Sequence, residues 1–400
     1  MKKLRVIFLK NTILLNKTQN KNFYMIAKTM FGLEEVLAQE LRNLGAQDIK
    51  KMNRAVSFKG DIGFLYKANL NLRTALRILK PIKYFQAHNN KELYKKLYEV
   101  EWSKIFKLNN TFSTSATTKS DTFKHSKFTS LLLKDAIADS FRDKYKKRPN
   151  VDPDEADIHI NLHISKNTCT LSLDSSGKSL HKRGYKIKSL TAPINEVLAS
   201  GLILISNWDK KKDFHDPMCG SGTILIEAAM IAQNIPANIF RKKFSFQKWK
   251  DFDSNLWEKI KETSLDKEID FKGKITGSDI SKKAIDICKK NINNALMKNK
   301  IEVFQADFFS TKVNENTFVL FNPPYGERLK LNQLNFYEDI GNTLKHSYEE
   351  CDVWLISSDI SEMKFIGLKP NKKIKLVNGK LECSFRKFQI YKGSKKLNKN

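Results

Sequence analysis

The chain has 400 residues, which is enough for two or three domains that each bury a hydrophobic core. With 40% hydrophobic and 29% charged residues it has the composition of a soluble globular protein, and no run of about 18 uncharged apolar residues predicts a membrane span. The formal net charge of +29 favours a polyanionic partner such as nucleic acid, because basic side chains that neutralise phosphates release counterions. An AT-rich genome also raises the lysine content, but here the acidic residues have not risen to match.

The five cysteines are scattered and form no CxxC pair. Their spacing argues against a zinc ribbon or a disulfide framework and fits a reducing, cytoplasmic setting. His159 and His163 alternate with apolar residues, a pattern that places both on the solvent-facing side of a strand. We therefore expect no metal site.

Residues 1–20 are expected to form a flexible leader, since Lys10 interrupts their apolar stretch and no small-residue cleavage site follows. Residues 21–80 then predict a small α+β unit. Its expected elements are a strand at 23–27, a helix at 32–45 with a glycine stop, a strand at 54–59 and a helix at 61–79 that Pro81 closes.

Residues 81–175 predict a second, larger α/β unit. It is followed by turn chemistry at 174–177 and by a basic linker over 176–190, where we place a domain boundary. The expected elements are a strand at 82–87, a helix at 91–100, a β-rich stretch at 111–117, a long amphipathic helix at 127–146, and strands at 156–164 and 167–173.

Residues 191–393 alternate strands with helices, which predicts a parallel sheet covered on both faces. An aromatic insertion at 236–272 precedes the second strand, and the tail at 394–400 is expected to fray. The expected strands are 212–216, 274–279, 301–304, 316–322, 351–357, 373–378 and 385–391, and the expected helices are 193–207, 223–234, 281–297 and 335–349.

The first strand of this region leads into a glycine-rich turn, FHDPMCGSGT, over residues 214–223. The strand ends at Asp216, and Gly220 and Gly222 precede a helix that begins near Thr223. Glycines at this edge of a sheet let the backbone approach a ligand closely. The turn is not a P-loop and lacks the third glycine of the dinucleotide fingerprint. A tight strand–helix turn without a ligand is the simple alternative.

Acidic residues follow the next two strands. Asp279 can accept hydrogen bonds from a pair of ribose hydroxyls, although a helix N-cap shared with Ser281 explains it as well. After the third strand, Asp307 can accept from an adenine amino group while Phe308 packs on the ring. A loop with buried aromatic residues is the alternative there.

The most specific motif is Asn-Pro-Pro-Tyr, which starts at Asn322 after the fourth strand. Pro323 has no N–H and restricts its neighbours, which leaves the Asn322 amide oxygen and the Pro323 carbonyl as acceptors at the strand end. Two adjacent acceptors match the two hydrogens of an exocyclic base amine, and Tyr325 offers a face for stacking the base. Holding the amine in this way orients its nitrogen for in-line attack on a methyl sulfonium.

Taken together, these motifs resemble the class I methyltransferase fold over residues 191–392, a Rossmann-like α/β fold with a seven-stranded, mostly parallel sheet. The resemblance implies S-adenosyl-L-methionine as cofactor and the target base beside Asn322, Pro323 and Tyr325. The implied cofactor-binding residues are Asp216, Pro217, Gly220, Ser221, Gly222, Thr223, Asp279, Ile280, Asp307 and Phe308.

Residues 191–196 and 378–383 further resemble bacterial RNA methyltransferases that carry a THUMP domain. The units at 21–80 and 81–175 look like the ferredoxin-like and THUMP parts of their RNA-binding half. This resemblance implies methylation of the exocyclic N2 amine of a guanosine, usually in 23S rRNA, after the base is flipped out or presented unpaired. We expect the protein to be a monomer. Asn195 departs from the family pattern, in which a basic residue often stands there.

Three alternatives stay open. A tRNA guanine-N2 methyltransferase is one, because THUMP domains also serve enzymes that recognise the tRNA acceptor end. A DNA adenine-N6 methyltransferase would share the fold and Asn-Pro-Pro-Tyr, but we would expect it to carry a sequence-reading module instead of the small basic units at 21–175. A non-catalytic RNA-binding ribosome-assembly factor would not need four intact motifs.

Overall fold

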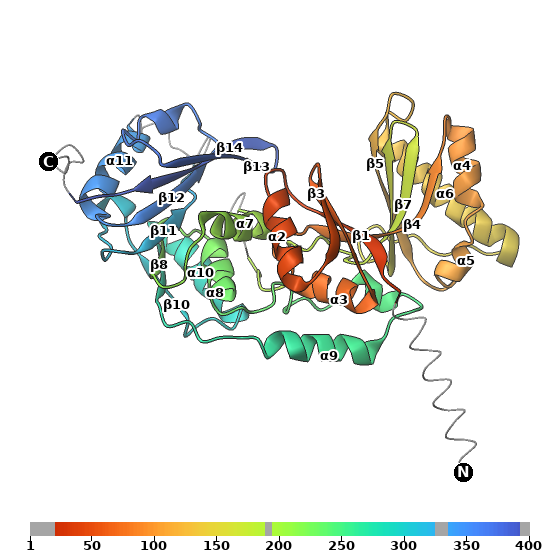
Figure 1. The fold of residues 1–400 in the computed structure, drawn as a ribbon, viewed down its shortest axis with the longest axis horizontal. Coiled ribbons are helices and arrows are strands. Elements are labelled where there is room, and N and C mark those ends of the chain that lie inside the picture. The colour runs from red at the N-terminus through yellow and green to blue at the C-terminus, as the bar shows by residue number, and fades with distance from the viewer. Residues whose placement is uncertain (1–20, 189–193, 325–334, 393–400) are drawn as a thin grey trace, which may run out of the picture. The chain divides into compact units, whose positions relative to one another are not determined.

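The computed structural model describes residues 21–188, 194–324 and 335–392. The chain divides into two compact units, each built on one seven-stranded sheet (Figure 1). Among the described residues, unit 1 comprises 21–29, 38–180 and 242–263, and unit 2 comprises 30–37, 181–241 and 264–392.

The sheet of unit 1 has the strand order β2-β3-β1-β4-β7-β6-β5. All neighbouring strands are antiparallel except β5 and β6. β4 pairs with β1 through its first residues and with β7 through the rest, so the two expected N-terminal units share one sheet. The strands are β1 (Phe23–Lys28), β2 (Gln47–Met52), β3 (Ala55–Gly60), β4 (Arg77–Gln86), β5 (Phe112–Lys119), β6 (Ile158–Ser165) and β7 (Thr168–Asp174).

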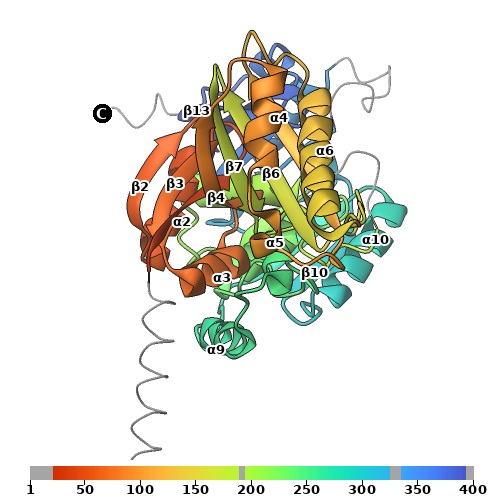
Figure 2. The same cartoon turned by 90° about the vertical axis from the view of Figure 1, so that its right-hand side faces the viewer.

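Helices of unit 1 cover one face of this sheet (Figure 2). On that face the Phe58 ring of β3 packs on the Phe64 ring of α3, and Thr114 of β5 bonds to Ser130 of α6. The paired register of the strands places both contacts on the same side. The helices are α3 (Ile62–Asn71), α4 (Asn90–Tyr98), α5 (Trp102–Ile105) and α6 (Ser126–Tyr145), together with most of α2 (Glu34–Leu44), whose first four residues belong to unit 2.

Two expectations for unit 1 are wrong. The helix expected at 61–79 ends at Asn71, because Leu72 is extended (φ −65°, ψ 124°), and β4 then runs through Pro81. The strand register shifts at Pro81, and this bulge tolerates a residue without an N–H. The polar strand β2 was not predicted. Five of its six residues are exposed and none is buried, so its sequence lacks the alternation of apolar and polar residues that indicates a strand.

His159 and His163 lie on the face of β6 that points away from the helices, but both are half-buried. Burial lowers the pKa of each imidazole. His159 Nδ1 lies 3.4 Å from the Ser245 hydroxyl, which belongs to the 242–263 segment. Within residues 21–188, 194–324 and 335–392, no three His, Cys, Asp or Glu side chains converge in a way that could hold a metal ion.

The 242–263 segment completes the core of unit 1. The Phe246 ring stacks on Tyr66 of α3 at 4.5 Å between centroids, and Trp257 meets the same tyrosine edge-on at 6.1 Å. Phe246, Tyr66 and Trp257 are all buried. Part of the expected aromatic insertion therefore packs with the N-terminal half of the chain. The helix of this segment is α9 (Ser254–Leu265).

The sheet of unit 2 has the order β10-β9-β8-β11-β12-β14-β13, in which the first five strands run parallel and β14 is antiparallel to both of its neighbours. The doubly wound α/β fold predicted from the alternation of strands and helices is confirmed. The strands are β8 (Phe214–Asp216), β9 (Ile275–Asp279), β10 (Ile301–Gln305), β11 (Phe318–Phe321), β12 (Asp352–Ser357), β13 (Lys372–Asn378) and β14 (Leu381–Gln389).

The helices of unit 2 fall within the ranges predicted for them. They are α7 (Glu196–Ser206), α8 (Thr223–Ala232), α10 (Lys282–Asn294) and α11 (Phe336–Ser347). None of the helices in the described parts of the chain is long and apolar enough to cross a membrane.

Candidate active site

The residues singled out in the sequence gather at one edge of the unit 2 sheet. Asp216 ends β8, Asp279 ends the neighbouring β9, and Asp307 follows β10 by two residues. Since β8, β9 and β10 are parallel, their carboxyl ends point to the same edge. β11 pairs with β8 on the other side, so Asn322 also emerges there. In open α/β sheets this edge is where ligands bind.

The loop between β8 and α8 takes a shape that requires glycine. Gly220 and Gly222 have φ of +53° and +81°, the left-handed region that costs other residues energy. Gly222 is also the N-cap of α8. A Cβ at Gly222 would lie 2.5 Å from the buried Cys288 Sγ of α10. The loop therefore packs tightly against Cys288 where it turns into the helix, and only glycine fits there.

Asp279 ties this loop to the end of β9. Its Oδ2 accepts from the Gly220 N–H at 3.0 Å, and its Oδ1 accepts from the Ser281 N–H at 2.9 Å. The cap of α10 is Ser281, whose hydroxyl accepts from Ala284 N–H at 3.3 Å. Asp279 is thus not the helix cap, and its half-buried carboxylate keeps lone pairs for another partner.

Asp216 is a buried carboxyl group, 1% exposed. Burial raises its pKa well above the usual range, and the negative charge of Asp279 adds to this effect. Its Oδ1 accepts one hydrogen bond, from Met218 N–H at 3.2 Å. A buried carboxylate gains most from a cationic or hydrogen-bond-donating ligand, because water is excluded from it.

Other residues of this loop are buried as well, and one of them has no hydrogen-bond partner among the described residues. Pro217 and Ser221 are buried. The Thr223 hydroxyl is buried, and no described residue hydrogen-bonds to it. A buried hydroxyl without a partner is uncommon in a native fold, and a polar group of a ligand would satisfy it.

The residues predicted to surround an adenine divide between surface and core. Ile280 is 67% exposed, whereas Phe308 is 3% exposed and packs on Phe321 and Tyr348 at 5.5 and 5.4 Å between centroids. Asp307 accepts from Phe309 N–H at 3.1 Å and caps a short 3₁₀ turn. Ile280 therefore offers more free apolar surface than Phe308.

Asn322 and Pro323 directly follow β11, with Asn322 half-buried and Pro323 buried. All four residues of β11 are buried, and Leu320 and Phe321 pair with β12, so this strand end is firmly placed in the sheet. Tyr325, the expected stacking residue, lies outside the described residues.

Two residues near the site were missed or left without a role. Asn195 caps α7 by accepting from Val197 N–H at 2.9 Å. Asn291 is fully buried on α10 and bonds to the Ser221 carbonyl. The sequence carried a signal for Asn291, since it is a polar residue beside Cys288 and Ile292 on the apolar side of the helix.

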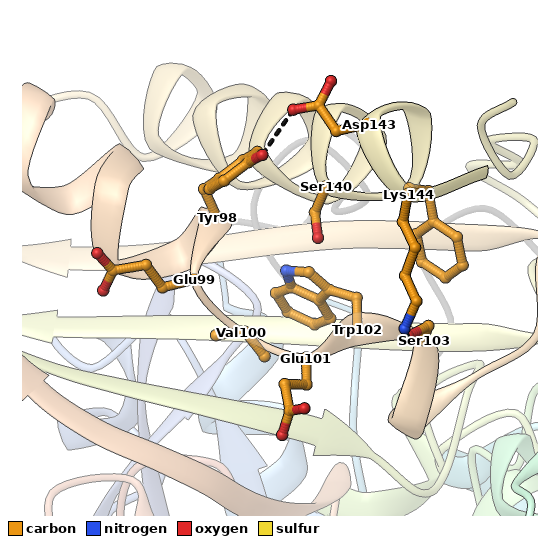
Figure 3. A pocket seen from close by; sticks show the side chains of 10 residues that line it. Tyr98, Glu99, Val100, Glu101, Trp102, Ser103, Ser140, Asp143 and Lys144 are labelled. Atoms are coloured by element: carbon orange, nitrogen blue, oxygen red, sulfur yellow. Dashed lines mark hydrogen bonds between the residues drawn. The ribbon is translucent and has the colours of Figure 1, made fainter. Parts of the chain in front are cut away.

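A separate cavity of about 390 Å³ lies in unit 1 beside α4, α5 and α6 (Figure 3). Its lining includes the carboxylates of Glu99, Glu101 and Asp143 and one lysine, Lys144. An acidic lining disfavours phosphate-bearing ligands, and none of the residues singled out in the sequence lines this cavity. The active-site assignment therefore depends on the strand-end loops of unit 2.

Comparison with known protein families identifies the family of this chain. Residues 183–387, more than half of the chain, match the family described as RMKL-like, methyltransferase domain. The chain belongs to this family. Residues 24–79 match the RlmL ferredoxin-like domain, and residues 87–174 match the THUMP domain. The family resemblance inferred from the motifs is confirmed.

Relatives of this RMKL-like methyltransferase differ in length. A candidate RNA methyltransferase of Synechocystis is 37% identical over 90% of this chain and 95% of its own length. The ribosomal RNA large subunit methyltransferase K/L of Buchnera aphidicola is 35% identical over 92% of this chain but only 54% of its own length. The chain thus spans about half of the K/L proteins that it resembles.

Solved structures agree with this fold. A candidate methyltransferase complexed with S-adenosylhomocysteine (SAH) has a TM-score of 0.82 at 30% identity and covers 94% of this chain and all of its own. A Listeria monocytogenes protein named a predicted N6-adenine-specific DNA methylase has a TM-score of 0.81 at 30% identity, over 94% of this chain and 97% of its own. SAH is what S-adenosylmethionine becomes on losing its methyl group. The RMKL-like protein is an S-adenosylmethionine-dependent methyltransferase, as predicted. The positive-φ glycines, the buried Asp216 and the Thr223 hydroxyl, which has no partner among the described residues, fit that cofactor.

Proposed function

We propose that this methyltransferase methylates RNA, at the exocyclic N2 amine of a guanosine, and that its substrate is 23S rRNA. The observation that carries the proposal is the placement of Asn322 and Pro323 at the end of β11, next to the strand that leads into the glycine loop. The THUMP and ferredoxin-like matches and the rRNA methyltransferase relatives support RNA as the polymer. Because the chain spans about half of the K/L relatives, the test below includes tRNA as well as 23S rRNA.

The cofactor is assigned to the strand-end loops. In this proposal the loop from Asp216 and Pro217 through Thr223 holds its amino-acid part, where the buried carboxyl meets a cationic group. Asp279 accepts from the ribose hydroxyls, Ile280 and Asp307 contact the adenine, and the buried Phe308 supports this part of the site from the core. Bound S-adenosylmethionine supplies a methyl group on an electrophilic sulfonium.

Asn322 and Pro323 would hold the base. The Asn322 side-chain oxygen and the Pro323 carbonyl accept the two hydrogens of the amine, which directs the nitrogen lone pair toward the cofactor loop. The main catalytic contribution is then positioning, which can supply several kcal/mol of the barrier. Tyr325 stays the predicted stacking partner of the base.

Unit 1 offers a surface for the RNA on the sheet face away from the helices. One row of paired residues crosses four strands, namely Tyr84, Thr170, His163 and Thr117. Tyr84 is 62% exposed, Thr117 is exposed, and the row has no acidic residue. Polar side chains with an exposed aromatic ring suit unpaired bases, which are stacked and hydrogen-bonded at their edges.

The test is a methyl-transfer assay with tritiated cofactor on 23S rRNA fragments, tRNA and duplex DNA, followed by nucleoside mass spectrometry. We expect N2-methylguanosine in rRNA alone. Label in tRNA would move the substrate to the tRNA alternative, and N6-methyladenine in DNA would refute the RNA proposal. No label in any polymer, with no cofactor binding, would favour the non-catalytic assembly factor.

The Asn322→Ala variant tests the mechanism. We expect it to lose at least about 100-fold in kcat, since positioning of the amine is lost, while its affinity for S-adenosylmethionine stays within about twofold. The matched control is Asn314→Ala. Asn314 is exposed and lies four residues before Phe318, the first residue of the same strand. Full activity in Asn322→Ala, or an equal loss in Asn314→Ala, would refute the assigned role.

A further inference from the structure

Asn291 of α10 uses every hydrogen-bonding position of its side chain. Its Oδ1 accepts from the N–H groups of Ile187 and Lys188 at 3.0 and 3.4 Å. Its Nδ2 donates to the carbonyls of Lys188 and Ser221, both at 3.0 Å. The side chain is fully buried, so each of these bonds replaces one that water would otherwise supply.

The bond to Ser221 fixes a peptide plane inside the cofactor loop. The Ser221 carbonyl belongs to the peptide whose N–H is that of Gly222, and this N–H donates to the Cys219 carbonyl at 2.8 Å. The plane is therefore held from both sides, directly before the glycine with φ of +81°. Ser221 is itself buried, which leaves its carbonyl little access to water if Asn291 is changed.

The attachment of residues 183–185 of the linker does not depend on Asn291. The Tyr185 hydroxyl donates to Glu227 at 2.9 Å, and Arg183 pairs with the same buried carboxylate at 3.3 Å. Asn294, three residues further along α10, donates to the Tyr185 carbonyl at 2.7 Å. These contacts hold residues 183–185 on unit 2 without touching the glycine loop.

We propose that Asn291 is a positioning residue for S-adenosylmethionine. Through the Ser221 carbonyl it sets the orientation of the loop from Gly220 to Gly222 and so determines the affinity for the cofactor. The proposal goes beyond the proposed function, because it depends on the family's cofactor and not on RNA, guanine or Asn322. Its failure and the failure of the RNA proposal are therefore separate outcomes.

The test compares Asn291→Asp with Asn294→Asp in the full chain. The first change keeps size and acceptors, but it removes both donors and sets a carboxylate oxygen against the Ser221 and Lys188 carbonyls. The second removes a linker contact of the same kind from the same helix. Calorimetry without RNA measures the Kd for S-adenosylmethionine, and thermal melting measures stability.

We expect Asn291→Asp to raise the Kd at least about tenfold, as the loss of buried hydrogen bonds implies, and Asn294→Asp to stay within about twofold. With saturating cofactor the kcat of Asn291→Asp should lie within about threefold of wild type, because the base-binding residues are unchanged. If Asn291→Asp does not fold, Asn291→Ser, which keeps one hydroxyl, replaces it with the same expected direction. Unchanged affinity in a folded Asn291 variant, or an equal loss in Asn294→Asp, overturns the proposal.

Discussion

Replacing Gly222 by alanine adds a single methyl group at the start of α8. Two effects make this substitution destabilising. The φ of +81° costs an L-residue about 1–2 kcal/mol, and the new Cβ would lie 2.5 Å from Cys288 Sγ. Cys288 is fully buried, so relieving that contact requires shifts in a packed core that cost about 1–3 kcal/mol. The free energy of unfolding should fall by about 2–5 kcal/mol.

A double-mutant cycle with Cys288→Ala separates the two effects. Removing the sulfur relieves the contact but leaves the backbone strain, so the double variant should recover about 1–3 kcal/mol relative to the sum of the single changes. Urea denaturation of all four proteins gives the free energies, and calorimetry gives cofactor affinity, which should fall in Gly222→Ala. A loss below about 1 kcal/mol, or a coupling energy near zero, would show that the loop has room for a side chain and refute the reasoning.

Two further predictions concern the RNA surface and pH. Tyr84→Ala should weaken the binding of unpaired RNA by roughly 5–100-fold, because one base loses its stacking partner. The control Phe128→Ala removes a 50% exposed ring from α6 and should leave RNA binding unchanged. Equal losses for both variants in a filter-binding assay would contradict the assignment of RNA to the sheet face. Burial lowers the pKa of His215 to about 4, so the folded state disfavours the proton that the unfolded chain takes up near pH 6.5, and stability falls as the pH drops from about 6.5 toward 4. Between pH 7 and 5 the free energy of unfolding of His215→Asn should fall by about 2 kcal/mol less than that of the wild type. An equal fall for both proteins in urea titrations would show that His215 does not cause the pH dependence.

Most of unit 2 could be predicted from the sequence because its signals are local. Parallel strands covered on both faces appear as short apolar runs, as in the fully buried β11. Each run ends in the polar or glycine-rich motif that lies at the ligand-binding edge. The position of a motif such as residues 214–223 in the fold can therefore be predicted, since the strand, the turn and the start of the helix are adjacent in the chain.

Unit 1 was harder because pairing between distant segments decides its structure. The apolar residues at 70–79 fit a helical pattern, but the partners β1 and β7 draw Arg77–Gln86 into a strand despite Pro81. The contacts of Asn291 were equally hidden, since its partners at 187–188 and 221 are backbone atoms far away in sequence. Burial of the polar residue was detectable, but its partners were not.

The return of residues 242–263 to unit 1 bears on how the chain is made. A ribosome synthesises the chain from its N-terminus, so Tyr66 is made long before Phe246 and Trp257, the residues whose rings pack on it. Until then the nascent N-terminal half exposes an apolar surface that a chaperone could recognise. For the same reason, expressing residues 21–180 alone would remove part of the core of unit 1, so an isolated RNA-binding half should include the 242–263 segment, for example through a short engineered linker.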